Sequence, residues 1–349
     1  MCNNHRGRAI SYGLEPVFHT RLVGSQPREI MAAEDGLADG SMADIVRALE
    51  LIHNPSSTNE LRREALQFVE SQKGSPSAAR NGFLLASRRE NDALVRYFGL
   101  TLLDHVLRHT SFTATDEIVG LREIVLKLAE SIQPEDPVYI RNKIPQLWGE
   151  VAKRSWGLDW IDMDERLVQL WNASLVHKEL VLLVLETLSE DIFYREDTVS
   201  SLRGTDLNRA LVEICTPLAV FEQAHPQRDN HIEIRCGNEG WLTRVCEFLQ
   251  ECIGSIQHSK QAKDAALKSL ANLKSVLVWS IPKAIHLSGC VQSIARAFTC
   301  ADEQVLLVSI LVFLKGRVLT ELSRLPSRHY MRCIAGLPMM SKDSNHWYL

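Results

Sequence analysis

The sequence predicts an all-α fold, an α-solenoid built from HEAT-like antiparallel helical hairpins. Three observations support this prediction. From Ser41 onward, apolar residues recur at helical spacing, and the alternation typical of strands is almost absent. Most connections between the predicted helices are short, so successive helices pair as hairpins. Two helices with two turns occupy roughly 35 to 47 residues, which is the period of HEAT-like repeats.

The predicted helices follow one another in a regular order after an aperiodic start. The breaker HNPSST separates the first two helices, the turn SWGLDW separates the sixth from the seventh, and a polar stretch follows the eighth. The expected spans are Ala43–His53, Asn59–Lys73, Ser77–Arg89, Asp92–His109, Thr115–Ile132, Pro137–Ser155, Asp162–Asn172, Val176–Phe193, Asp206–Gln223, Glu239–Gln257, Ser259–Trp279, Pro282–Phe298 and Asp302–Leu322.

The chain divides into four parts. Residues 1–40 have little periodicity, and we expect a disordered lead-in there. Residues 41–110 and 111–325 carry the predicted hairpins. Residues 326–349 have no helical period and are expected to form an irregular tail, which fits either a truncated gene model or a real short product.

The stretch around SWGLDW raises a choice between chemistry and packing. A helix face is formed by residues at three- and four-residue spacing, namely Ile140, Ile144, Leu147, Trp148 and Val151. Gly157 lets the chain turn, and Asp159 or Asp162 can cap the next helix. We therefore expect Trp156 and Trp160 to close the hairpin by packing across it, with Trp148 on the helix face beside them.

Composition limits the possible classes of function. The formal net charge of -4 and a pI near 6.3 exclude a globally basic nucleic-acid binder, although a local basic stripe stays open. No apolar run approaches the roughly 18 to 20 residues that span a bilayer, so we expect no membrane insertion. The 8 cysteines form no CxxC pair. Buried free thiols are therefore favoured over a zinc site.

The sequence shows no convincing catalytic, metal or cofactor motif. His105 and His109 lie four residues apart, but HVLRH lacks the glutamate of a metalloprotease helix. The segment DWIDMDE lacks the glycine and the frame of a calcium loop, which favours a capping and solvated cluster. Phosphate-loop and nucleophile-elbow orders are missing as well. We expect no enzymatic activity, no metal and no cofactor.

Basic side chains recur on the second helices of successive hairpins. In a solenoid these helices line the concave surface, where such proteins bind their partners. The alternative is that the side chains simply face solvent. The residues concerned are Arg62, Arg63, Arg96, Arg141, Lys143, Lys153 and Arg154.

Three segments carry a family resemblance. The segment from YIRNKIPQLWGEVAKRSWGLDW through LVLLVLETLSEDI resembles the exportin-1-like domain of nuclear transport receptors. NELRREALQFVESQK and DALVRYFGLTLLDHVLRH look like importin-β N-terminal repeats, which assigns residues 41–110 to those repeats and 111–325 to the exportin-1-like part. The overall match is to the exportin-five type. Gly157 departs from the usual proline, Pro145 lies inside the IRNK helix, and the chain has about a third of the expected length.

The resemblance implies the amino-terminal portion of a nuclear export receptor that shuttles between nucleus and cytoplasm. Such a portion would bind Ran-GTP through its inner helices, while protein or structured RNA cargo would need further repeats, and nucleoporins are another possible class of partner. The nucleotide would belong to Ran. The positions implied for Ran contact are Arg62, Arg96, Asn142, Lys143 and Arg154. Two alternatives stay open, a generic HEAT scaffold without Ran dependence and an RNA-binding fragment.

Overall fold

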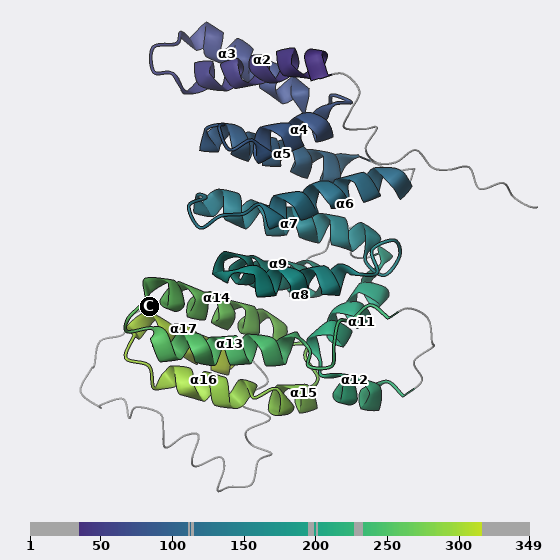
Figure 1. The fold of residues 1–349 in the computed structure, drawn as a ribbon, viewed down its shortest axis with the longest axis vertical. Helices are drawn as coiled ribbons and strands as arrows, with labels where there is room; N and C mark the ends of the chain where they lie inside the picture. The colour runs from purple at the N-terminus through teal and green to yellow at the C-terminus, as the bar shows by residue number, and fades with distance from the viewer. Residues whose placement is uncertain are drawn as a thin grey trace, which may run out of the picture.

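The computed structural model describes residues 35–110, 112, 115–194, 199, 202–226 and 233–315. Within these ranges the chain forms fifteen α-helices and no strand, which confirms the predicted all-α class. The helices, labelled in Figure 1, are α2 (Asp35–His53), α3 (Asn59–Gln72), α4 (Ala78–Ser87), α5 (Ala93–His109), α6 (Thr115–Glu130), α7 (Val138–Ser155), α8 (Met163–Ala173), α9 (Leu175–Phe193), α11 (Gly204–Cys215), α12 (Leu218–Ala224), α13 (Trp241–Ser255), α14 (Lys260–Val276), α15 (Pro282–Leu287), α16 (Cys290–Phe298) and α17 (Glu303–Lys315).

The helices form hairpins that stack as successive layers, as expected for a HEAT-like solenoid (Figure 1). The hairpins are α2–α3, α4–α5, α6–α7, α8–α9, α13–α14 and α16–α17. The second helices α5, α7, α9, α14 and α17 each pack closely on the next, whereas α4 touches α2 and α6 only lightly. The row with the closer spacing lies on the inside of a bend. The second helices therefore form the inner row.

Several helices begin where a side chain caps the free backbone N–H groups of the first turn. Thr58 accepts a hydrogen bond from the Leu61 N–H at 3.3 Å, Asp92 from the Leu94 N–H at 2.8 Å, and Ser259 from the Ala262 N–H at 3.2 Å. These caps fix the starts of α3, α5 and α14 close to the predicted positions.

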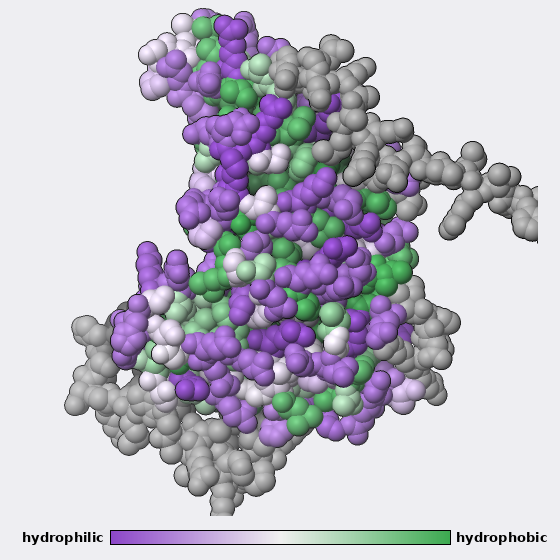
Figure 2. All heavy atoms as spheres, viewed as in Figure 1, coloured by the Kyte–Doolittle hydropathy of each residue, from purple (hydrophilic) through white to green (hydrophobic). Residues whose placement is uncertain are grey.

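Apolar side chains are buried between the layers. The face drawn in Figure 2 is mainly hydrophilic, with apolar residues visible in places. A continuous core runs from Ala86 to Val312, and a smaller core joins α2 and α3 to α4 and α5. The hairpin α4–α5 is especially tight because Gly82 and Gly99 face each other. A Cβ atom at Gly99 would lie 2.6 Å from the Gly82 carbonyl oxygen, so the two helix backbones are nearly in contact.

Two predicted helices are wrong because each is interrupted. The helix expected at 206–223 ends at Cys215 and restarts at Leu218, since Pro217 has no N–H and holds Thr216 in an extended conformation. The helix expected at 282–298 breaks at Gly289, which has φ 71°. In addition, α2 begins at Asp35 rather than Ala43. The lead-in before residue 35, the end of the last predicted helix after Lys315 and the tail at 326–349 lie outside the described residues.

The helix α7 runs without a break through Pro145, from Val138 to Ser155. It ends in a tight turn in which Gly157 has φ 74°, a conformation that favours glycine. The Trp160 N–H donates to the Ser155 carbonyl at 3.0 Å, and Trp156 and Trp160 form a backbone bridge. Trp148, Trp156 and Trp160 are all buried, and the rings of Trp148 and Trp160 are 5.0 Å apart.

The acids of this turn divide into exposed and buried groups. Asp159, Asp162 and Glu165 face solvent, but Asp164 is buried. The Asp164 carboxylate accepts hydrogen bonds from the Trp241 indole N–H and the Cys236 N–H, both at 2.6 Å. Burial raises the pKa of Asp164 to about 6, against the lowering effect of these donors. The expectation of a solvated cluster is thus wrong for Asp164, which fastens α8 to the loop before α13.

Candidate protein-interaction surface

The inner row of second helices carries a continuous set of ion pairs, which we call the central charge network. It joins α5, α7 and α9 through side chains of alternating sign. Its members are Asp104, Arg108, Lys143, Glu150, Lys153, Arg154 and Asp191. Lys143 lies 3.0 Å from Asp104, Asp104 lies 3.0 Å from Arg108, and Arg108 reaches Glu150 at 3.0 Å.

Glu150 is the centre of the network. Besides Arg108, its carboxylate binds Lys153 at 2.9 Å and Arg154 at 2.9 Å, and Lys153 continues to Asp191 at 3.1 Å. The side chains of Glu150 and Lys153 are only 3% and 2% exposed. A charge buried to this extent is tolerated only with close partners of opposite sign. The network therefore holds α5, α7 and α9 in one arrangement.

The electrostatics at the outer end of the network follow from the same contacts. Burial by itself would raise the pKa of Asp104, but hydrogen bonds from Arg108 and Lys143 lower that pKa below its ordinary value. Burial would likewise lower the pKa of Arg108, yet the hydrogen bond to Asp104 and the charge of Glu150 raise it. Both groups are fixed in their charged forms at neutral pH.

Two smaller ion clusters extend this pattern along the inner row. Arg141 of α7 and Lys268 of α14 both bind the Glu179 carboxylate of α9. Near the start of α7, the Asp136 carboxylate forms ion pairs with Arg89 at 2.6 Å and with Arg96 at 2.7 Å. Burial alone would raise the pKa of Asp136, and the hydrogen bond from Arg96 is the main cause that lowers it. Successive hairpins are thus linked by carboxylates that each hold two cations.

Four of the five positions implied for Ran contact already bind groups within the chain. Arg62 donates to the carbonyls of Asn54 and Pro55 at 2.8 and 2.9 Å, and Arg96 donates to Asp136 and the Ala86 carbonyl. Both therefore hold loops between helices.

The other three positions lie on α7. Lys143 and Arg154 belong to the central charge network, while Asn142 is exposed to solvent. The structure thus brings Lys143 and Arg154 into one network, but it places Arg62 and Arg96 apart from them.

The sequence pattern indicated several cations of the inner row, but it missed Arg108 and Lys268 and the acids that pair with these cations. Asp104, Glu150, Glu179 and Asp191 were not singled out, although all four lie beside basic residues of the row. A local signal was present, because Asp104–Arg108 and Glu150–Arg154 have the four-residue spacing of helical ion pairs.

One carboxyl on the inner row gives a testable dependence of stability on pH. Burial and the neighbouring Glu190 raise the pKa of Glu186 from 4.5 to about 7, while Lys274 of α14 opposes this shift. The folded chain then binds more protons than the unfolded chain between these values, so Glu186 makes the protein less stable as pH rises from 4.5 to 7. We expect Glu186→Gln to remove this part of the slope and to raise the melting temperature at pH 8.

The measurement is the melting temperature by circular dichroism from pH 4.5 to 8. Glu247→Gln on the exposed face of α13 is the matched control and should leave the slope unchanged. Parallel curves for the wild type and Glu186→Gln would contradict the prediction.

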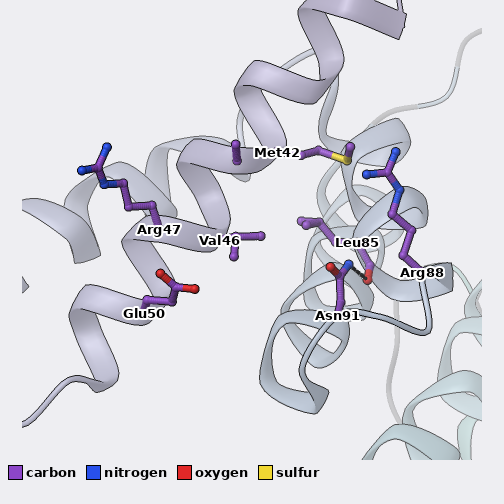
Figure 3. Close-up of a pocket in the computed structure, with 8 residues that line it drawn as sticks. Met42, Val46, Arg47, Glu50, Leu85, Arg88 and Asn91 are labelled. Carbon is purple, nitrogen blue, oxygen red and sulfur yellow. Dashed lines mark hydrogen bonds between the residues drawn. The ribbon is translucent and has the colours of Figure 1, made fainter.

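Two cavities lie outside the inner row, where the first helices separate. A cavity of about 540 Å³ lies between α2 and the α4–α5 hairpin. Figure 3 shows Met42 and Val46 of α2 on one side, with Leu85 and Asn91 on the other and the Asn91 amide bonded to the Leu85 carbonyl. A second cavity of about 940 Å³ is lined by α4, the end of α5 and α6, including Phe83, Val106 and Ile124. The second cavity is also lined by polar side chains, namely His105, His109, Asp116, Glu117 and Lys127.

The cysteines, the histidine pair and the apolar helices of the described residues were the other candidates for a functional role. The six cysteines within the described ranges are free thiols, and nowhere in those ranges do three or more His, Cys, Asp or Glu side chains lie together as metal ligands would. His105 and His109 lie against each other with ring centres 4.4 Å apart. Among the described helices, none is long and apolar enough to cross a membrane.

Comparison with known proteins shows which proteins the chain is similar to. Residues 137–222, from the start of α7 into α12, match the family described as exportin 1-like protein. Protein MSN5 of Saccharomyces cerevisiae is 29% identical over 279 residues, which is 75% of this chain and 22% of that protein. Exportin-5 of Homo sapiens is 30% identical over 174 residues, covering 48% of this chain and 14% of the relative. Exportin-6 of Danio rerio is 24% identical over 173 residues, with coverages of 48% and 15%. The chain therefore spans between about a seventh and a fifth of these relatives.

Proposed function

Because the chain is similar to protein MSN5 over 75% of its length and to exportin-5 over 48%, we propose that it is the amino-terminal portion of a nuclear export receptor that binds Ran-GTP. The observation that carries the proposal is the exportin 1-like match at residues 137–222, which contains two of the closely packed second helices, α7 and α9. A solenoid presents such a row as a continuous binding surface.

The contact with Ran-GTP would centre on α7. Asn142 is exposed, Lys143 is the next residue, and Arg154 lies about three turns farther along the same helix; the side chains of Lys143 and Arg154 are each 14% exposed. Arg62 and Arg96 hold loops between helices and lie apart from these positions. The role is one of binding without catalysis, and the nucleotide stays with Ran.

Cargo and transport follow from the same proposal. Protein or structured RNA cargo would be held together with further repeats, because the relatives are several times longer than this chain. Movement between nucleus and cytoplasm, with contacts to nucleoporins, completes the proposed role.

The test is a pull-down with the full chain and Ran loaded with a non-hydrolysable GTP analogue, beside Ran-GDP. We expect binding that is selective for the GTP form. Asn142→Ala combined with Lys143→Gln should weaken it by about tenfold or more, because contacts near the centre of an interface carry most of the affinity. Arg209→Glu, at an exposed site on α11, is the control and should bind as the wild type does.

The alternative function is a HEAT scaffold that holds protein partners without Ran dependence. The internal pairing of Lys143, Arg154 and Arg96 favours it, because these cations are already neutralised within the chain. Equal binding of Ran-GTP and Ran-GDP, or no binding by a well-folded helical chain, would support the scaffold and reject the export receptor.

A further inference from the structure

Apolar side chains are exposed at the amino ends of α5 and α7, where a solvated helix face would normally be polar. We call Leu94, Tyr97, Val138 and Tyr139 the amino-edge patch; their exposed fractions are 45%, 36%, 57% and 43%. Tyr97 and Tyr139 meet edge to face, with ring centres 5.3 Å apart. The four residues therefore form one surface across two hairpins.

The loops that precede α5 and α7 are fastened side by side. Arg89 and Arg96 from the α4–α5 hairpin both bind Asp136, which precedes α7 by two residues. Asp136 is buried and also accepts the Gln133 N–H at 2.9 Å. The amino-edge patch is thus presented on a rigid base, which lowers the entropy cost of binding a partner.

Three acidic side chains lie on the loops next to the amino-edge patch, and we call them its acidic rim. Glu90, Asp92 and Glu135 are exposed on the loops beside it, and none has a cation partner among the described residues. Asp92 caps α5, but Glu90 and Glu135 lie before the cap residues, so helix capping does not explain them. Arg141, the nearest base on α7, is held by Glu179. Arg89 and Arg96 share Asp136, so the exposed charges at this edge that lack a partner of opposite sign among the described residues are the three carboxylates.

We propose that the amino-edge patch binds a protein segment in which lysine or arginine flanks bulky apolar side chains. Tyrosines with apolar neighbours form the centre of typical protein interfaces, and charges lie at the rim. The acidic rim would steer a basic segment toward the patch and would repel nucleic-acid phosphates. The proposal does not require that Ran binds.

Fluorescence anisotropy with the full chain tests this surface directly. The probe is an 18-residue labelled peptide of leucine, alanine and lysine, with leucines at helical spacing. A second peptide has glutamate in place of lysine, and a labelled RNA hairpin is the third probe. We expect the lysine peptide to bind, more weakly as salt increases, and the other two probes not to compete for the site.

Paired variants locate the binding. Glu90→Lys with Glu135→Lys, and separately Tyr97→Ala with Tyr139→Ala, should each raise the Kd of the lysine peptide by about tenfold or more. Glu247→Lys with Glu251→Lys on exposed positions of α13 makes the same change in net charge and should leave the Kd unchanged. Equal weakening by both charge reversals, competition by the RNA hairpin, or no binding of the lysine peptide would overturn the proposal.

Discussion

Replacing Gly99 with alanine should lower the free energy of unfolding by about 3 kcal/mol, because the new methyl group meets backbone rather than a side chain that can move. Its Cβ would lie 2.6 Å from the Gly82 carbonyl oxygen and 2.7 Å from the Ala86 nitrogen. Relief requires α4 and α5 to separate, which also opens the smaller core that both helices share with α2 and α3. Urea denaturation followed by circular dichroism measures the loss.

The same substitution at Gly120 gives the matched control. Gly120 lies inside α6 with no atom within 4 Å of a Cβ built there. Alanine should therefore raise the free energy of unfolding by about 0.8 kcal/mol, since glycine weakens a helix interior by that amount. If Gly99→Ala and Gly120→Ala change stability in the same direction, steric contact between α4 and α5 is not what the glycine at position 99 provides.

Helical periodicity predicted most of the fold because each helix carries an apolar stripe, which is buried against the partner helix and the neighbouring hairpins. The first eight predicted helices all exist, with ends that differ from the structure by up to two residues apart from the start of α2. The breaks at Pro217 and Gly289 were missed, since the apolar spacing continues across both positions. Pro217 itself is a local signal that could have located the first of these breaks, because the residue before a proline disfavours the helical conformation.

The candidate site was predicted less well than the fold, because its contacts join distant parts of the chain. Glu179 meets Arg141 across 38 residues and Lys268 across 89, and Asp164 meets Trp241 across 77. Helical spacing shows which side chains share one face of a helix, but it does not show the side chain that faces them from the next hairpin. Spacing alone therefore overstated how far cations such as Arg96 are available to a partner.

Replacing Glu150 with alanine should destabilise the inner row by about 3 to 5 kcal/mol, the range observed when one partner of a buried ion pair is removed. Glu150 is the common partner of Arg108, Lys153 and Arg154, and its side chain is 3% exposed. Without it, Lys153 keeps Asp191, but its own side chain remains only 2% exposed. The loss is measured as the urea midpoint of the full chain.

The control is Glu165→Ala on α8, where an exposed carboxylate accepts a hydrogen bond from Gln169. Exposed polar positions contribute little, so this change should stay within about 0.5 kcal/mol.

A double variant separates the ion pair from simple loss of packing. Lys153→Met removes the buried cation and keeps most of its volume, so Glu150→Ala combined with Lys153→Met should lose at least about 1 kcal/mol less than the sum of the two single changes. Strict additivity would mean that Glu150 and Lys153 stabilise the fold independently. Glu150 and Lys153 both lie on α7, so in that case their mutual pair would not link the contacts to its neighbours, and the Arg108–Glu150 pair to α5 and the Lys153–Asp191 pair to α9 would act independently.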